Sequence, residues 1–114
     1  MLTKDEILAA DDRESITVPV PEWGGDVRLR AMSGSQRDQY EQRLYHSRKG
    51  NEIVNLRATL LAFCLVDDDD RQMFSADEID ALGGKAAKPI AKLFEVAQRL
   101  NWLDDDALED AKGN

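Results

Sequence analysis

The stretch "IVNLRATLLAFCLV", residues 53–66, is the most apolar part of this 114-residue chain, and the other segments must pack against it. Its main apolar positions follow the i, i+4, i+7, i+8 spacing of one helical face: Leu56, Leu60, Phe63 and Cys64. The pattern predicts a central core helix over residues 53–66. Within that run the single cysteine is typical of a small buried hydrophobe, not of a nucleophile.

Three further helices are predicted on the C-terminal side and just before this core. Residues 87–101 carry an apolar stripe, and Pro89 falls in the first turn, where a missing N–H costs little. Ser75 with Glu78 forms a capping box for a short helix that Gly83 ends. Ser33 caps a polar helix that Gly50 interrupts, and its few apolar residues are Tyr40, Leu44 and Tyr45.

The N-terminal third predicts a short helix followed by a β-hairpin. Thr3 with Glu6 fits a capping box for one or two helical turns. In "SITVPVPEWGGDVRLRAM", residues 15–32, apolar and polar residues alternate on both sides of "PEWGG", as in two paired strands. Pro19 has no N–H for a ladder, so the first strand is expected at an edge.

These elements together define an α+β fold that is mostly α-helical, with one hairpin packed on three to four helices. A single domain is expected over residues 1–114. It comprises a helix and hairpin over residues 1–32, a helical part over 33–103 and an acidic tail over 104–114. Residues 53–66 and 87–101 are its expected core pair.

The net charge of −8 argues against binding to nucleic acid or to a membrane surface, because both need a basic face. The first residues carry acids where a signal peptide needs a basic start, and no apolar run approaches a membrane helix. A cytoplasmic protein is therefore expected.

The run "DDDD", Asp67–Asp70, suggests a calcium loop that ends at Glu78, but two positions contradict it. Starting at Asp67, the fifth position is Arg71 where an oxygen ligand is needed, and the sixth is Gln72 where the loop requires glycine. The interpretation favoured by the sequence is a solvated acidic turn.

Other chemistries lack their residues. His46 and Cys64 alone cannot supply a closed zinc site, and "ALGGKAAK" has alanine where a phosphate loop needs a hydroxyl. No G-x-S-x-G motif is present. We predict no catalytic residue, no metal and no cofactor.

Charge is segregated along the chain. Residues 28–57 hold seven bases against three acids, and residues 67–80 hold seven acids against Arg71. Two interpretations stay open: compensation within one chain, or complementary patches that join copies or dock a partner. The candidate patch residues are Arg28, Arg30, Arg37, Arg43 and Arg48 on the basic side, and Asp67, Asp68, Asp69 and Asp70 on the acidic side.

Aromatic and apolar residues outside the expected core are candidate partner contacts, since aromatic side chains are enriched among interface anchors. Trp23 lies at the hairpin tip, and Trp102 follows the last strong helix. Tyr40, Leu44 and Tyr45 on the sparse polar helix complete this set.

The order of elements, and above all "VDDDDRQMFSADEIDALGGKAAKPIAKLFEVAQRLNWL", residues 66–103, resembles the tail assembly chaperones of long-tailed bacteriophages and prophages. The resemblance implies a non-enzymatic protein that binds and solubilises the tape measure protein. It also implies recruitment of tail tube subunits, absence from the mature virion and, in many members, a longer frameshifted form. The sequence leaves one alternative, a small acidic regulatory or inhibitory protein that mimics nucleic acid.

Overall fold

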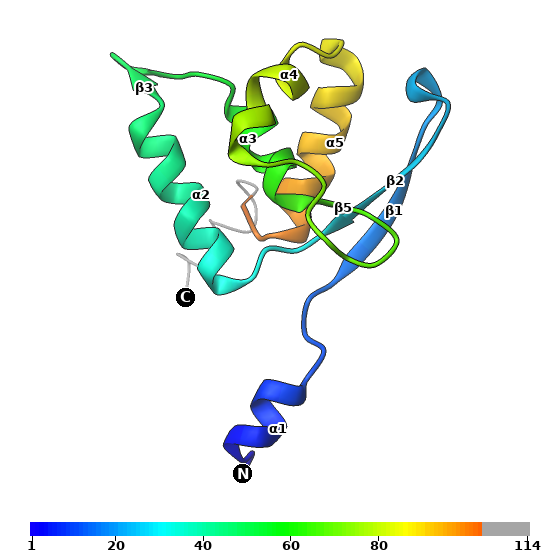
Figure 1. Cartoon of the computed structure of the whole chain (residues 1–114), viewed down its shortest axis with the longest axis vertical. Coiled ribbons are helices and arrows are strands. Elements are labelled where there is room, and N and C mark those ends of the chain that lie inside the picture. The colour runs from blue at the N-terminus through cyan, green and yellow to red at the C-terminus, as the bar shows by residue number, and fades with distance from the viewer. Residues whose placement is uncertain (104–114) are drawn as a thin grey trace.

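The computed structural model describes residues 1–103, and Figure 1 shows a small sheet beside a group of helices. Short 3-10 turns lie at Pro21–Trp23 and Ala76–Glu78. The helices and strands in chain order are α1 (Lys4–Ala9), β1 (Ser15–Val20), β2 (Gly25–Arg30), α2 (Gly34–His46), β3 (Arg48–Lys49), β4 (Glu52–Ile53), α3 (Leu56–Cys64), β5 (Leu65–Val66), α4 (Ile79–Gly83) and α5 (Ala87–Leu100).

The predicted hairpin is confirmed, and β1 and β2 pair antiparallel with Val18 opposite Val27. The 3-10 turn at the tip ends at Gly24, whose φ of 79° is one that glycine adopts without strain. The strand order β1-β2-β5 leaves β1 at an edge, as Pro19 predicted. The carbonyl of Pro19 accepts a hydrogen bond from Nζ of Lys92 at 2.7 Å, which ties the hairpin to α5.

The predicted core helix is wrong at both of its ends. α3 covers only Leu56–Cys64, because Asn55 has a left-handed backbone at φ 55° and Leu65 turns to an extended one. Leu65 and Val66 pair with β2 as strand β5, where their backbone groups join the sheet. Ile53 belongs to β4 instead of the helix.

A second, two-stranded ribbon was not predicted. Arg48 pairs with Ile53 and Lys49 with Glu52 across a turn at Gly50, which has φ 64°. The ribbon connects the end of α2 to the start of α3. It accounts for the interruption that Gly50 predicted.

The core lies where α3 packs against α5, α2, α4 and the sheet. Val20, Leu29, Leu60, Leu61 and Leu93 are fully buried at its centre. The stripe predicted on residues 87–101 supplies part of it, although the helix ends at Leu100. The expected pairing of the two strongest helices is therefore confirmed.

Side-chain caps fix where three of the helical segments begin. At the predicted Ser75 cap, the N–H and hydroxyl of Ser75 donate to the Glu78 carboxylate at 3.0 and 3.2 Å. Thr3 with Glu6 forms the other predicted capping box, with hydrogen bonds in both directions. Ser33 does the same with Gln36 at the start of α2. Each box satisfies N–H groups that have no partner inside the helix.

The end of α5 is fastened to the start of α2 by Asn101. Its Oδ1 accepts a hydrogen bond from the Met32 N–H at 2.8 Å, and its Nδ2 donates to the carbonyl of Ala97 at 2.8 Å. The same Nδ2 lies 3.3 Å from Sγ of Cys64. One amide thus joins three segments of the chain.

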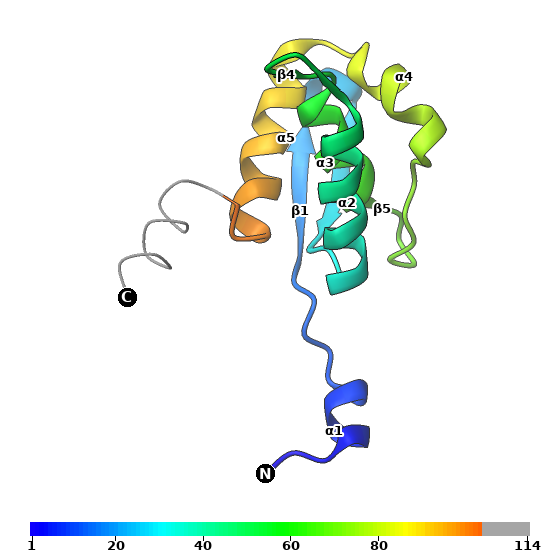
Figure 2. The ribbon, with the colours of Figure 1, turned by 90° about the vertical axis from the view of Figure 1, so that its left-hand side faces the viewer.

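Helix α1 stands apart from the rest of the described chain in both views (Figures 1 and 2). Residues 1–10 are all exposed. The chain is first anchored at Arg13, whose Nε donates to the Ala31 carbonyl and whose Nη2 donates to Gln36. The acidic tail predicted over 104–114 lies outside the described residues.

Candidate binding surface

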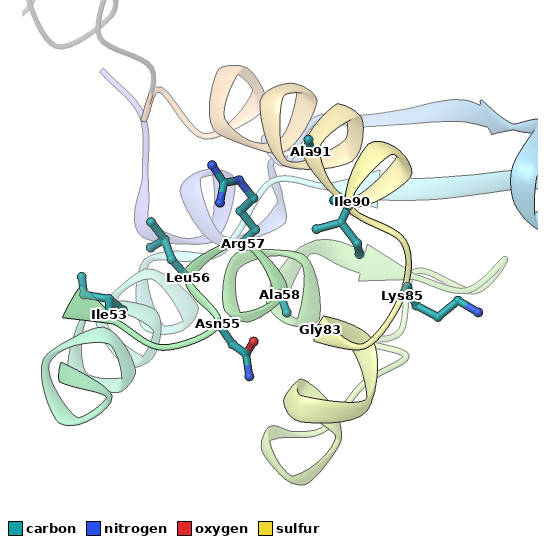
Figure 3. Close-up of a pocket in the computed structure, with 10 residues that line it drawn as sticks. Ile53, Asn55, Leu56, Arg57, Ala58, Gly83, Lys85, Ile90 and Ala91 are labelled. Carbon is teal, nitrogen blue, oxygen red and sulfur yellow. The ribbon is translucent and has the colours of Figure 1, made fainter. Parts of the chain in front are cut away.

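A groove of about 610 Å³ lies between the start of α3, the loop after α4 and the start of α5. Figure 3 shows Leu56 and Arg57 on one side and Ile90 and Ala91 on the other. Lys85 extends from the loop that leads into α5. We call this hollow the α3–α5 groove; its other lining residues are Ile53, Asn55, Ala58, Gly83 and Ala87.

The α3–α5 groove has both apolar and polar side chains in its walls, and its charge is basic. Arg57 and Lys85 are its charged lining residues within the described chain, and none of its lining residues there is acidic. The guanidinium of Arg57 lies 5.5 Å from the ring centre of Phe94, a cation–π distance. Asp80 lies nearby, where its carboxylate accepts a hydrogen bond from Asn55 at 2.7 Å. The groove therefore suits an apolar group flanked by acids.

A second, smaller hollow of about 200 Å³ lies at the hairpin tip, and we call it the Trp23 pocket. Trp23 and Phe74 face Ala81 and Leu82 of α4, and Lys85 completes the lining. The exposed lining is almost entirely apolar. Lys85 borders both hollows, so the two lie next to each other on the surface.

The structure does not bring the five predicted contact residues together. Tyr40 is buried and packs edge-on against Phe63 at 6.1 Å, and burial raises its pKa. Leu44 is half-buried on α2, and Tyr45 is 72% exposed near its C-terminal end. Trp102 is 71% exposed after α5, with a left-handed φ of 59°. Trp23 borders a hollow near α4, and Trp102 borders a separate hollow of about 270 Å³.

The two charged segments lie side by side within one chain. Nε of Arg28 and Oδ1 of Asp70 are 2.7 Å apart, and Arg43 reaches toward the Ala76 carbonyl at 3.5 Å. The hydrogen bond from Arg28 lowers the pKa of Asp70. Arg37 pairs with Glu41 on its own helix. Among the candidate patch residues, Arg28 and Asp70 are thus paired with each other, and Arg37 is paired within α2.

The aspartate run forms the acidic turn that the sequence favoured. The Asp67 carboxylate accepts hydrogen bonds from the N–H groups of Asp69 and Arg71, at 2.8 and 3.0 Å. Gln72 then bridges to Val66 and donates its side-chain amide to the carbonyls of Ala62 and Phe74. In residues 1–103, no three metal-ligating side chains converge.

Cys64 is fully buried, and burial raises the pKa of its thiol to about 11. At neutral pH the group is therefore protonated and sealed from solvent. His46 is exposed at the end of α2, beside the ring of Tyr45. Among residues 1–103, no helix is long and apolar enough to cross a membrane.

Most residues of the two hollows were missed by reasoning from the sequence. The α3–α5 groove combines residues 53–58 with residues 83–91, which are about thirty positions apart. One available signal was Gly50-Asn51, a dipeptide typical of two-residue hairpin turns, which would have shortened the core helix at its start.

Comparison with known proteins gives the class. The family model described as phage tail assembly chaperone matches residues 4–113 of this chain. The chain belongs to that family, whose members are chaperones and not enzymes.

Among solved structures, the fold is similar to the tail assembly chaperone of bacteriophage HK97, with a TM-score of 0.61. The two share 25% sequence identity over 84% of this chain and 90% of the HK97 chain. No curated protein sequence matches this one. The resemblance carried by residues 66–103 is thereby confirmed, and the chain has a role in assembling phage tails.

Proposed function

We propose that this tail assembly chaperone binds the tape measure protein, keeps it soluble and helps recruit tail tube subunits. It acts in the cytoplasm of the bacterial host and is absent from the mature virion. These partners follow from the family resemblance. The physical requirement is a site that accepts apolar helical side chains on a protein that itself stays dispersed.

The observation that carries the proposal is the Trp23 pocket. It offers an open apolar hollow of about 200 Å³ between the hairpin tip and α4. Trp23 is half-buried, so its ring is held in place while one part of it stays accessible. A large side chain of a client helix would be desolvated there, as at the anchors of helix-in-groove interfaces.

The exterior supports the second requirement. The chain carries a net charge of −8 and 33% charged residues, and acidic surface residues favour solubility more than basic ones. A complex that covers an aggregation-prone client with such copies would repel other complexes. The bound chaperone copies would thus give the complex a charged surface that keeps it soluble.

The other predicted contacts remain proposals with a narrower basis. Tyr45 and Trp102 are exposed and could extend the client surface, with Leu44 supporting Tyr45 from the same helix. Association of copies through charge now rests on the exposed Arg43, Arg48, Asp68 and Asp69. Arg28 and Asp70 are already paired with each other.

Co-expression with the tape measure protein of the same locus tests the function. We expect the wild-type chain to raise the soluble yield of the tape measure protein and to co-purify with it. Ala81→Arg places a charged side chain in the Trp23 pocket from an exposed helical position. We expect that variant to lose most of the gain.

Ser35→Arg adds the same charge on the exposed face of α2 and serves as the matched control. No gain in soluble tape measure protein with the wild-type chain would overturn the function. The fold of Ala81→Arg is checked by circular dichroism. If this variant still gives the full gain in soluble tape measure protein, the client binds outside the Trp23 pocket.

A further inference from the structure

The N-terminal residues form an arm whose apolar face is exposed and packs against no other part of residues 1–103. Within α1, Ile7 is 58% exposed and Leu8 is 77% exposed, while Leu2 just before the helix is 71% exposed. Leu2 and Ile7 occupy the two positions of a hydrophobic staple around the Thr3 cap. Residues 1–12, before the anchor at Arg13, are the arm.

A helix of six residues is marginal in water by itself. The capping box at Thr3 and Glu6 helps to define where it begins, and the hydrogen bonds from Thr3 lower the pKa of Glu6. Most helical stability in proteins, however, comes from packing an apolar face. The arm therefore has the features of a segment that gains order by docking.

We infer that the arm of one copy docks in the α3–α5 groove of a second copy. The groove offers apolar walls from Ile53, Leu56 and Ile90 and has the cations Arg57 and Lys85 at its lining. The arm offers Ile7 and Leu8 between four acids and a single lysine: Asp5, Glu6, Asp11, Asp12 and Lys4. The charges are complementary, which favours this register over others.

The positions of the arm and the α3–α5 groove indicate that the arm docks on a second copy and not on its own chain. The arm extends from one end of the molecule, and the groove lies between the starts of α3 and α5 at the other end (Figures 1 and 2). A groove of about 610 Å³ is within the size range of clefts that hold ligands, so it can receive side chains of one helical turn. Such an exchange is head to tail and uses two different patches.

Sedimentation velocity over a concentration series of the full-length chain tests the exchange. Ile7→Glu with Leu8→Glu removes the apolar face of the arm without touching the buried core. Ala91→Glu places an acid in the groove from an exposed position of α5. Each variant should weaken self-association by about tenfold or more, since it removes apolar burial or adds repulsion.

Met73→Glu changes another exposed apolar residue and should leave association at the wild-type level. Mixing the two defective variants provides the decisive measurement. The Ala91→Glu chain keeps an intact arm and the arm variant keeps an intact groove, so the mixture should form heterodimers and no longer species. No heterodimer in the mixture, or wild-type association of either variant alone, would overturn the inference.

Discussion

Oδ1 of Asn101 accepts the Met32 N–H at 2.8 Å, although the two residues are 69 positions apart. The bond joins the end of α5 to the segment between the hairpin and α2. Because the same amide also donates to Ala97, its oxygen and nitrogen have distinct roles. This side chain therefore fixes how the last described helix meets the N-terminal half of the chain.

Asn101→Ala should lower the free energy of unfolding by about 1–3 kcal/mol, since partly buried backbone groups lose their partner. Asn101→Asp keeps the acceptor for Met32 but places a negative charge near the Ala97 carbonyl, so it should also destabilise the fold. Urea unfolding followed by circular dichroism measures both. Wild-type stability of Asn101→Asp would show that the nitrogen contributes nothing.

The Arg28–Asp70 pair predicts a specific dependence on pH. Its hydrogen bond lowers the pKa of Asp70 in the folded chain, so the pair stabilises the fold above the ordinary aspartate pKa of about 3.9. That contribution is lost as pH falls through the lowered folded pKa. The difference in urea midpoint between wild type and Asp70→Asn should therefore be constant near neutrality and vanish in acid.

Asparagine suits this test because it tolerates the left-handed backbone of residue 70, which has φ 62°. Asp68→Asn removes a charge from the same turn but breaks no ion pair within residues 1–103, and is the matched control. A difference that persists unchanged at low pH would assign the effect to packing and not to charge.

Glycine is required at position 83 because the Asn55 side chain leaves no room for a Cβ, and not because of the backbone conformation there. A Cβ at this position would lie 2.6 Å from Oδ1 of Asn55, whose amide is held by Asp80. Gly83→Ala should displace that amide and destabilise the fold by about 1 kcal/mol. Gly34→Ala meets nothing within 4 Å in the first turn of α2 and should stabilise by about 0.4–1 kcal/mol. Opposite shifts in thermal midpoint are expected.

The rate at which a reagent labels the Cys64 thiol should report on unfolding of the chain. Burial raises its pKa to about 11 and removes it from solvent, so a thiol reagent at pH 8 should label the native chain very slowly. The labelling rate should increase with urea in step with unfolding. Asn101→Ala removes the amide that lies 3.3 Å from Sγ of Cys64, so it should increase the labelling rate in native buffer. Rapid labelling of the native wild type would contradict the burial.

Local patterns in the sequence predicted the elements whose signals lie in a few neighbouring residues. The hairpin followed from alternation around "PEWGG", and the caps at Thr3 and Ser75 followed from a partner three residues away. β5 could not be predicted in this way, because Leu65 and Val66 continue the apolar pattern of α3. Pairing with β2, which is distant in sequence, decides their backbone.

The candidate surface was predicted less well than the fold. Trp23 was expected at the hairpin tip, but Phe74 and Leu82, which complete its pocket, are brought there only by the packing of α4. Tyr40 was expected among the contacts because its helix is polar. That helix nevertheless turns Tyr40 toward Phe63 in the core.

The edge strand β1 bears on whether copies of this protein aggregate when they are concentrated in one place. An unpaired strand is a template on which a neighbouring chain can add its own, and repeated addition produces fibres. Here Pro19 supplies no N–H, and its carbonyl is already occupied by Lys92. Copies of this chaperone that come close together would therefore meet through side chains and not by adding strands to β1, so their contacts would stay reversible.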